Sequence, residues 1–300
     1  MRSRREDAGR GERARSGRGA SPGAPGPESL QSKLDRLEAR LARLEARVED
    51  PSDAVLSLLR RRGLRVHSWN PTDAILLPGA APPEVSQKFF RLLHKYSFRL
   101  FLRDVIKLRR FHPADLADYA GERTVLSYLD CLAAADMLVA RPGGAMALAR
   151  DPVVSFGETL EWFVAQLLQR EYGAPAIWSV RLNGTRTGGD YDVLAAAEGR
   201  LIYIEVKSSP PKHVVVEEVA AFLDRVEALA PAGAVFLEDT GLRMFDKIVP
   251  MFADALAARG LPPPKRIQGE LFSAGDRVLI ANSKPDLARN LGVCLGRLLG

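Results

Sequence analysis

The sequence predicts a mixed α/β domain, with helices on both faces of its sheet, that follows a mainly helical region and a short coiled coil. Three observations predict this order. Leucines repeat near the N-terminus, helical periodicity runs through the middle of the chain, and strand-like apolar runs alternate with helices in the second half. We therefore divide the 300 residues into four segments, 1–28, 29–50, 51–150 and 151–300.

The positive charge is concentrated in the first half of the chain. The formal charge is +6, with fifteen basic and nine acidic residues in 51–150 but sixteen basic and nineteen acidic residues in 151–300. A basic region of this size is typical of proteins that bind a polyanion such as DNA; the alternative is a solvated basic surface. The chain has no apolar run of about 18 residues and no signal-peptide pattern, so we expect a cytoplasmic protein with no membrane partner.

Residues 1–28 are rich in arginine, glycine, serine and proline, with seven arginines against three acids in the first 20. Such a segment cannot bury enough apolar surface to offset the entropy of ordering its chain. We therefore expect a disordered basic tail.

Six apolar residues at alternating spacings of four and three form the seam of the coiled coil predicted in 29–50. Acidic residues fall at e positions and basic residues at g positions, so opposite charges face each other across a parallel dimer. We expect a homodimer through residues 30–48; the alternative is a single amphipathic helix that docks on its own domain. The apolar positions are Leu30, Leu34, Leu37, Leu41, Leu44 and Val48, the e positions Glu38 and Glu45, and the g positions Lys33, Arg40 and Arg47.

The segment 51–150 reads mostly as helices. A helix in SFRLFLRDVIKLRRF precedes a short helix in HPADLADYAG, a longer one in ERTVLSYLDCLAAADML, and two β-prone runs in LVARPGGAMALARDP. This order resembles the winged helix-turn-helix of bacterial DNA-binding proteins. The alternative is a protein–protein docking module. The resemblance implies that Arg123, Thr124, Ser127 and Tyr128 face the DNA groove and that Arg141 lies on the wing.

After residue 150 the pattern changes to strands joined by short turns, with helices between some of them. This pattern is typical of a sheet covered on both faces. We expect helices at 156–173, 215–230, 244–260 and 285–299, and strands at 176–183, 190–197, 200–209, 233–238 and 276–282.

Charged residues interrupt two of these apolar strands. Asp190 and Asp192 lie in DYDVLAAA, and Glu205 and Lys207 lie in RLIYIEVKSS. Burying a charge is costly unless the group is paired or binds a metal. An acid and a lysine at the end of a two-sided strand therefore indicate a functional site; the alternative is a pair of edge strands with solvated charges.

The helix with Gly157 and Glu161, the strand with Asp192 and the Glu205-x-Lys207 pair together resemble the PD-(D/E)xK nuclease superfamily, which has the restriction-endonuclease-like fold. The likeness covers roughly residues 152–240 and extends to archaeal Holliday junction resolvases and type IV restriction subunits. It implies a DNA endonuclease that hydrolyses phosphodiester bonds with Mg²⁺ or Mn²⁺. The sequence has no glycine-rich phosphate-binding loop, so we expect no nucleotide cofactor.

The residue types suit this chemistry. Asp192 and Glu205 on adjacent strands offer oxygen ligands to one hard cation, and the carbonyl of Val206 offers another. Lys207 lies on the same strand face as Glu205 and is expected to orient or deprotonate the attacking water. The resemblance implies a further acid, Glu161.

Two other acids compete for these positions. Helix geometry places Glu161 at the edge of the apolar stripe and Glu158 further toward solvent, which favours Glu161. Asp190 shares a strand face with Asp192, but the resemblance assigns the metal to Asp192. The next helix carries Glu217 and Glu218 where several relatives have a glutamine.

Three basic residues near the acids are candidate DNA-phosphate contacts, with a solvated turn as the alternative. The function we predict is a cation-dependent endonuclease placed on DNA by the winged helix. The alternative is a non-catalytic DNA-binding regulator or adaptor that retains the nuclease fold. The three basic residues are Arg181, Arg186 and Lys212.

Overall fold

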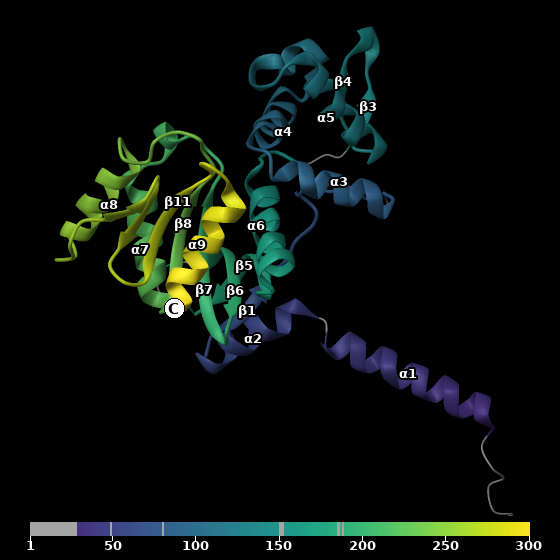
Figure 1. Ribbon diagram of the computed structural model, residues 1–300, viewed down its shortest axis with the longest axis horizontal. Coiled ribbons are helices and arrows are strands. Elements are labelled where there is room, and N and C mark those ends of the chain that lie inside the picture. Colours follow the sequence, from purple (N-terminus) through teal and green to yellow (C-terminus); the bar gives the residue numbers. More distant parts are fainter. Residues whose placement is uncertain (1–28, 49, 80, 150–152, 185–186, 188) are drawn as a thin grey trace, which may run out of the picture. The chain divides into compact units, whose positions relative to one another are not determined.

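The computed structural model of the protein describes residues 29–48, 50–79, 81–149, 153–184, 187 and 189–300 (Figure 1). The expected basic tail, residues 1–28, lies outside these ranges. The chain divides into two compact units, Met1–Asp50 and Pro51–Gly300. Across the described ranges, every helix is too short or too polar to cross a bilayer.

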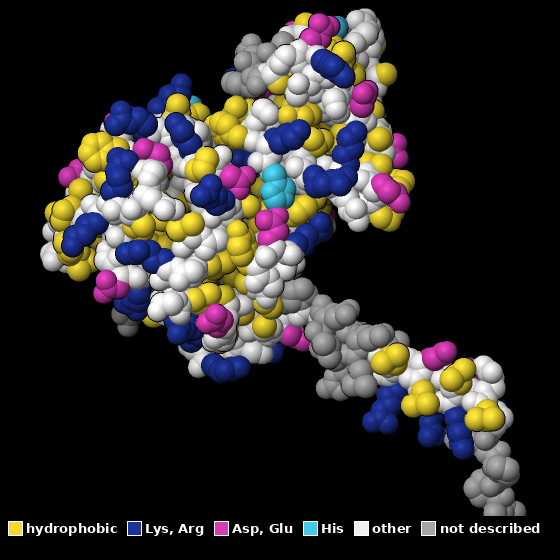
Figure 2. Space-filling model, viewed as in Figure 1, with side chains coloured by type: hydrophobic (Ala, Val, Ile, Leu, Met, Phe, Trp, Pro, Cys, Tyr) yellow, Lys and Arg dark blue, Asp and Glu magenta, His cyan; other side chains and the backbone are white. Residues whose placement is uncertain are grey.

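The first unit contains the helix α1, Leu30–Val48. Four leucines along it are exposed, from 51% for Leu34 to 88% for Leu30. Figure 2 shows these hydrophobic side chains in a row along the helix, beside a separate row of basic side chains. The helix is therefore amphipathic with an apolar stripe open to solvent, as the heptad pattern predicts, while the dimer itself stays a prediction.

The second unit is built on an eight-stranded mixed sheet with the strand order β1-β5-β6-β7-β8-β11-β10-β9. The strands β5, β6 and β7 form an antiparallel meander, and β8 then pairs parallel with both β7 and β11. The strands are β1 Arg65–Ser68, β5 Ala176–Asn183, β6 Asp190–Ala197, β7 Arg200–Lys207, β8 Gly233–Glu238, β9 Lys265–Gln268, β10 Leu271–Ala274 and β11 Val278–Asn282.

Helices cover both faces of this sheet, as the sequence predicts. Along β7, Ile202 and Ile204 enter one hydrophobic core, whereas Leu201 and Tyr203 enter the other. The first core contains side chains of α6 and α9, and the second contains side chains of α2, α7 and α8. The helices are α2 Pro51–Arg61, α6 Gly157–Tyr172, α7 Val216–Leu229, α8 Ile248–Ala257 and α9 Leu287–Leu299; η3, Pro211–His213, is a 3₁₀ turn.

The sheet also takes in a segment that the sequence analysis grouped with the helical region. The strand β1 pairs antiparallel with β5, and Val55 and Leu59 of α2 are fully buried in the second core. Residues 51–68 therefore pack with the sheet. The four-residue strand Arg65–Ser68 is too short for its alternation to be distinguished from a loop by pattern alone.

The remaining helical part has its own small sheet of three antiparallel strands, in the order β2-β4-β3. Helix α4 precedes β2, a 3₁₀ helix and α5 follow, and β3 and β4 form a hairpin across Gly143 and Gly144, which both have positive φ. The elements are α3 Pro83–Leu93, α4 Tyr96–Leu108, β2 Arg110–Phe111, η1 Pro113–Tyr119, α5 Glu122–Ala134, β3 Leu138–Ala140, η2 Pro142–Gly144 and β4 Met146–Leu148.

Candidate active site

The site lies where β6 and β7 end their pairing. The pairing runs from the turn to Val193 and Ile204. Asp192, the next residue of β6, places its Oδ2 2.7 Å from the backbone nitrogen of Val206, which donates a hydrogen bond to it. A carboxylate thus takes the position that a backbone carbonyl would take in a continuous ladder.

Glu205 is 2% exposed and its carboxylate is fully engaged. Its Oε1 lies 2.8 Å from Nζ of Lys207, and Nη1 of Arg225, on α7, lies 3.0 Å from its Oε2. The hydroxyl of Tyr203 donates a further hydrogen bond to Oε2. Two cations and a phenol therefore compensate this buried charge.

Lys207 bridges two acids. Besides Glu205, its Nζ lies 3.0 Å from Oε1 of Glu218 on α7. Burial alone would lower the pKa of Lys207, but the two carboxylates outweigh it and raise that pKa above its usual value. In this arrangement Lys207 is an ammonium that donates hydrogen bonds, which suits the orienting role better than the base.

Glu161, on α6, is held by a hydrogen bond from the hydroxyl of Ser179 to its Oε2, 2.5 Å long. Burial raises the pKa of Glu161 to about 7, and the charges of Glu158 and Glu205 add to the rise. Ser179 has φ 45°, a left-handed conformation that is unusual inside a strand. The strand is thus distorted where it meets the acid, which is common at functional sites.

The three acids are close enough to affect one another. Burial raises the pKa of Asp192 well above its usual range, and the carboxylates of Glu205 and Glu161 raise it further. Within the described ranges, no group of three or more Asp, Glu, His or Cys side chains is arranged so that it could hold a metal ion. The structure thus brings Asp192, Glu205, Lys207 and Glu161 to one region while directing Glu205 toward Lys207 and Arg225.

Next to Lys207 the end of β8 carries two buried acids that the sequence analysis missed. Asp239 is fully buried and receives hydrogen bonds from Arg99, at 2.8 and 3.0 Å, and from Arg103 and Ser283. These guanidiniums lower the pKa of Asp239 although burial alone would raise it.

Glu238 is also 0% exposed, but neither of its carboxylate oxygens has a hydrogen-bond partner among the residues that the structure describes. Burial, with the charge of Asp239 second, raises the pKa of Glu238 to about 9. It is therefore a neutral acid at pH 7 in this arrangement.

Arg225 and Ser179 were also missed. Arg225 lies seven residues after Glu218, two helical turns along one face of α7, so helical spacing carried a usable signal for it. Ser179 and Glu238 carried none, because each depends on the pairing of strands. Asp190 forms an exposed ion pair with Arg181, with 3.2 Å between Nε and Oδ1, and so differs from the half-buried Asp192.

One predicted DNA contact is wrong. Tyr128 is 2% exposed, packs against Phe98 and Phe101, and its hydroxyl lies 2.9 Å from that of Ser97. It lies on the buried stripe of α5 with Val125.

The other predicted contacts lie on the surface. Arg123, Thr124 and Ser127 are exposed on α5, and Arg141 is exposed before the hairpin turn. Lys212 is exposed and its carbonyl accepts a hydrogen bond from Lys247. The remaining candidate, Arg186, lies outside the described residues.

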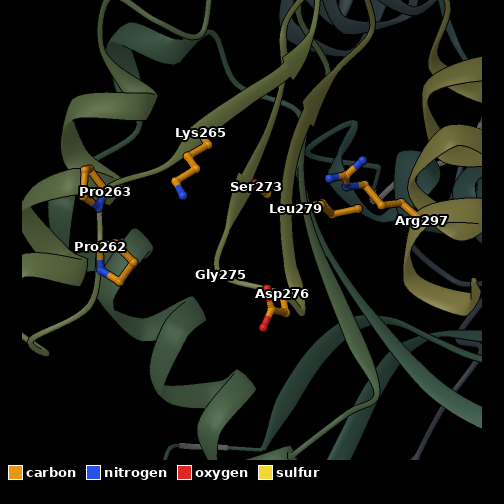
Figure 3. Close-up of a pocket in the computed structure, with 8 residues that line it drawn as sticks. All are labelled: Pro262, Pro263, Lys265, Ser273, Gly275, Asp276, Leu279 and Arg297. Atoms are coloured by element: carbon orange, nitrogen blue, oxygen red, sulfur yellow. The ribbon is translucent and has the colours of Figure 1, made fainter.

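A cavity of about 520 Å³ lies elsewhere, against β9, β10, β11 and α9 (Figure 3). Its charged lining residues, Lys265, Asp276 and Arg297, come from different elements and point in different directions. The lining includes none of the predicted site residues. We therefore attach no ligand to it.

No protein-family model and no curated protein sequence matches the chain. Among solved structures it is similar to protein VC1899 from Vibrio cholerae, with a TM-score of 0.48 and 16% identity over 80% of this chain and 61% of that one. It is also similar to Can2 from Sulfobacillus thermosulfidooxidans in complex with cyclic tetra-adenylate, with a TM-score of 0.45 and 14% identity over 79% and 60%. The chain spans about three-fifths of each structure, and TM-scores below 0.5 carry no argument about function.

Proposed function

We propose that the protein is a DNA endonuclease that hydrolyses phosphodiester bonds with Mg²⁺ or Mn²⁺ at Asp192, Glu205 and Lys207. One observation carries the proposal: two carboxylates and an ammonium meet where β6 and β7 separate, with Glu161 close by. Acids whose pKa values are raised by burial cluster at sites that act on a ligand, which supports the proposal.

The acids fit a hard divalent cation by their donor chemistry. Carboxylate oxygens are the ligands that Mg²⁺ prefers, and a cation would relieve the mutual repulsion that adds to burial in raising the pKa of Asp192. Asp192, Glu205, the carbonyl of Val206 and Glu161 would hold it. When bound, such an ion stabilises negative charge on a phosphoryl oxygen and favours deprotonation of water.

The chain's own residues would divide the remaining work. Lys207, as an ammonium, would orient the attacking water and neutralise charge that develops on the phosphate. Arg225 and Tyr203 hold Glu205 from the opposite side, and Glu218 limits the movement of Lys207.

The helical part supports placement on DNA by a winged helix. Its order of helix, strand, 3₁₀ helix, helix and hairpin, with the sheet order β2-β4-β3, is that expected of this module. Arg123 and Ser127 on α5 and Arg141 at the hairpin would contact the DNA. Exposed Glu122 and Asp130 flank them, so the positive surface is broken by acids.

The apolar stripe of α1 supports a homodimer. Leu34, Leu37 and Leu41 are more than half exposed, which is unfavourable unless another helix covers them. A second copy of α1 would also place basic g positions against acidic e positions. Sedimentation of the full chain and of a Leu37→Lys variant tests this, with dimer expected only for the former.

The function is tested by incubating labelled linear, nicked, branched and single-stranded DNA with the full chain and Mg²⁺ or Mn²⁺. We expect cation-dependent cleavage that falls about 100-fold or more in Lys207→Ala, because general acid–base and charge effects contribute about 10² to 10⁴. Lys265→Ala, an exposed lysine on β9 that is outside the group of Asp192, Glu205 and Glu161, is the matched control. Equal cleavage by the Lys207 variant would contradict the proposal.

A second candidate is a non-catalytic DNA-binding protein. The observation that favours it is the complete engagement of Glu205 by Lys207, Arg225 and Tyr203, an arrangement that is stable without a cation. Salt-sensitive DNA binding with no cleavage of any substrate would support this candidate.

A further inference from the structure

Glu238 ends β8 directly beside Lys207. The two strands are parallel, and Lys207 and Glu238 are paired in register, so their side chains project from the same face of the sheet. The backbone nitrogen of Asp239 donates a 2.8 Å hydrogen bond to the carbonyl of Lys207, which fixes this alignment.

A fully buried carboxyl with both oxygens unpartnered is costly, and proteins seldom retain one without a use. The neighbouring Asp239 shows that this end of β8 can satisfy an acid completely, because Arg99, Arg103 and Ser283 all donate to it. Among the buried carboxyl groups that the structure describes, Glu238 alone has both oxygens without a partner, and it lies beside Lys207.

Lys207 has a hydrogen-bond donor to spare. An ammonium carries three N–H groups, and Lys207 uses two acceptors, Glu205 and Glu218, among the described residues. A divalent cation that binds the oxygens of Glu205 would repel this ammonium from them.

We propose that Glu238 is an alternative hydrogen-bond acceptor for the Lys207 ammonium. When a divalent cation binds Glu205, Lys207 retains its hydrogen bond to Glu218 and donates its other hydrogen bond to Glu238 instead of Glu205. Glu238 is thus a positioning residue that holds Lys207 close to the phosphate while the cation is bound. This inference rests on the proposed function, since it requires a cation at Glu205. Either protonation state of Glu238 offers an acceptor oxygen, so the shift needs no change in its charge.

The test uses the full chain with Glu238→Met and Glu238→Gln, and with Glu217→Gln, an exposed acid of α7, as the control. Without a cation, Glu238→Met should raise the melting temperature, because it replaces a buried carboxyl by an apolar side chain of similar size. Mn²⁺ binding, measured by calorimetry, should weaken about tenfold in Glu238→Met, as is typical when a residue supporting a metal site is lost. Glu238→Gln keeps one acceptor oxygen and should fall between this variant and the wild type.

The outcomes separate the inference from the function on which it rests. A lower melting temperature for Glu238→Met would make Glu238 structural and overturn the inference. Unchanged Mn²⁺ affinity in both Glu238 variants, with a wild type that binds Mn²⁺ and cleaves DNA, would overturn the inference alone. A wild type that binds no Mn²⁺ by calorimetry and cleaves no DNA would overturn both.

Discussion

Glu238 and Asp239 are consecutive acids at the end of β8, and their buried carboxyls differ in the partners that surround them. Asp239 is matched by two guanidiniums and a hydroxyl, and its pKa is lowered. Glu238 is just as buried, has no hydrogen-bond partner among the described residues, and its pKa is raised to about 9. Asp239 is therefore compensated by its own neighbours, whereas Glu238 is left for a further partner, which the inference above assigns to Lys207.

The same contrast separates the two ionic clusters of the sheet. The Asp239 cluster joins α4 to β8 and β11. The Glu205 cluster lies one strand away, where Asp192 and Glu161 have raised pKa values. Substitutions in the first should lower stability most, whereas substitutions in the second should change activity and the pH dependence of stability.

The largest effect on stability is expected at Asp239. Asp239→Ala leaves Arg99 buried without its partner, and the free energy of unfolding should fall by about 3–5 kcal/mol, as for other broken buried pairs. Urea denaturation measures this, with Asp190→Ala, which breaks an exposed pair, as the control. If both substitutions cost the same, the Asp239 cluster is not the structural one.

A smaller effect is expected from the titration of Glu161. Its pKa is raised to about 7 in the folded protein, above the usual carboxyl value, so folding is favoured when the group is protonated. Its contribution is complete at low pH and is lost as the pH rises toward 7. Glu161→Gln should therefore remove about 1–3 kcal/mol of pH dependence between about pH 4.5 and 7.

Melting temperatures across this pH range measure the Glu161 effect, and Glu158→Gln is the control on the same helix. If the melting temperatures of Glu161→Gln and of the wild type change with pH in the same way, the pKa of Glu161 is not raised in the folded protein.

The smallest effect is expected on the exposed face of α5. Arg123→Ala should weaken DNA binding about fivefold and reduce its salt dependence by about one ion, because one phosphate contact is lost. Tyr128→Phe should leave DNA binding unchanged and cost about 1 kcal/mol of stability, since it loses only its hydrogen bond to Ser97. If Tyr128→Phe weakened DNA binding and Arg123→Ala left it unchanged, Tyr128 would be a DNA contact.

The strands of the site were predictable because their apolar runs are bounded by turns. The ranges 176–183, 190–197 and 233–238 agree with β5, β6 and β8. Asp192, Glu205 and Lys207 stood out as charges inside those runs. Local pattern was sufficient in this part of the chain, because the residues that define each strand lie within its own short stretch of sequence.

The sequence predictions failed where the pairing of strands, or the face of a helix that is buried, determines the surroundings of a residue. Tyr128 shares the buried stripe of α5 with Val125 and Leu129, so the 3.6-residue period already opposed a groove-facing role. Glu238 is an ordinary strand-end acid until the parallel register places it beside Lys207. No short sequence window contains both residues, because β8 reaches β7 only after the whole of α7 has intervened.

The Asp239 cluster bears on how this protein can be dissected. A fragment starting at residue 151 would lack Arg99 and Arg103, leaving Asp239 buried and without these partners, and would lack β1 at the edge of β5. We therefore expect residues 51–300, which form one compact unit, to unfold cooperatively. Scanning calorimetry of residues 51–300 should give a single transition, in which the helical part and the sheet melt together.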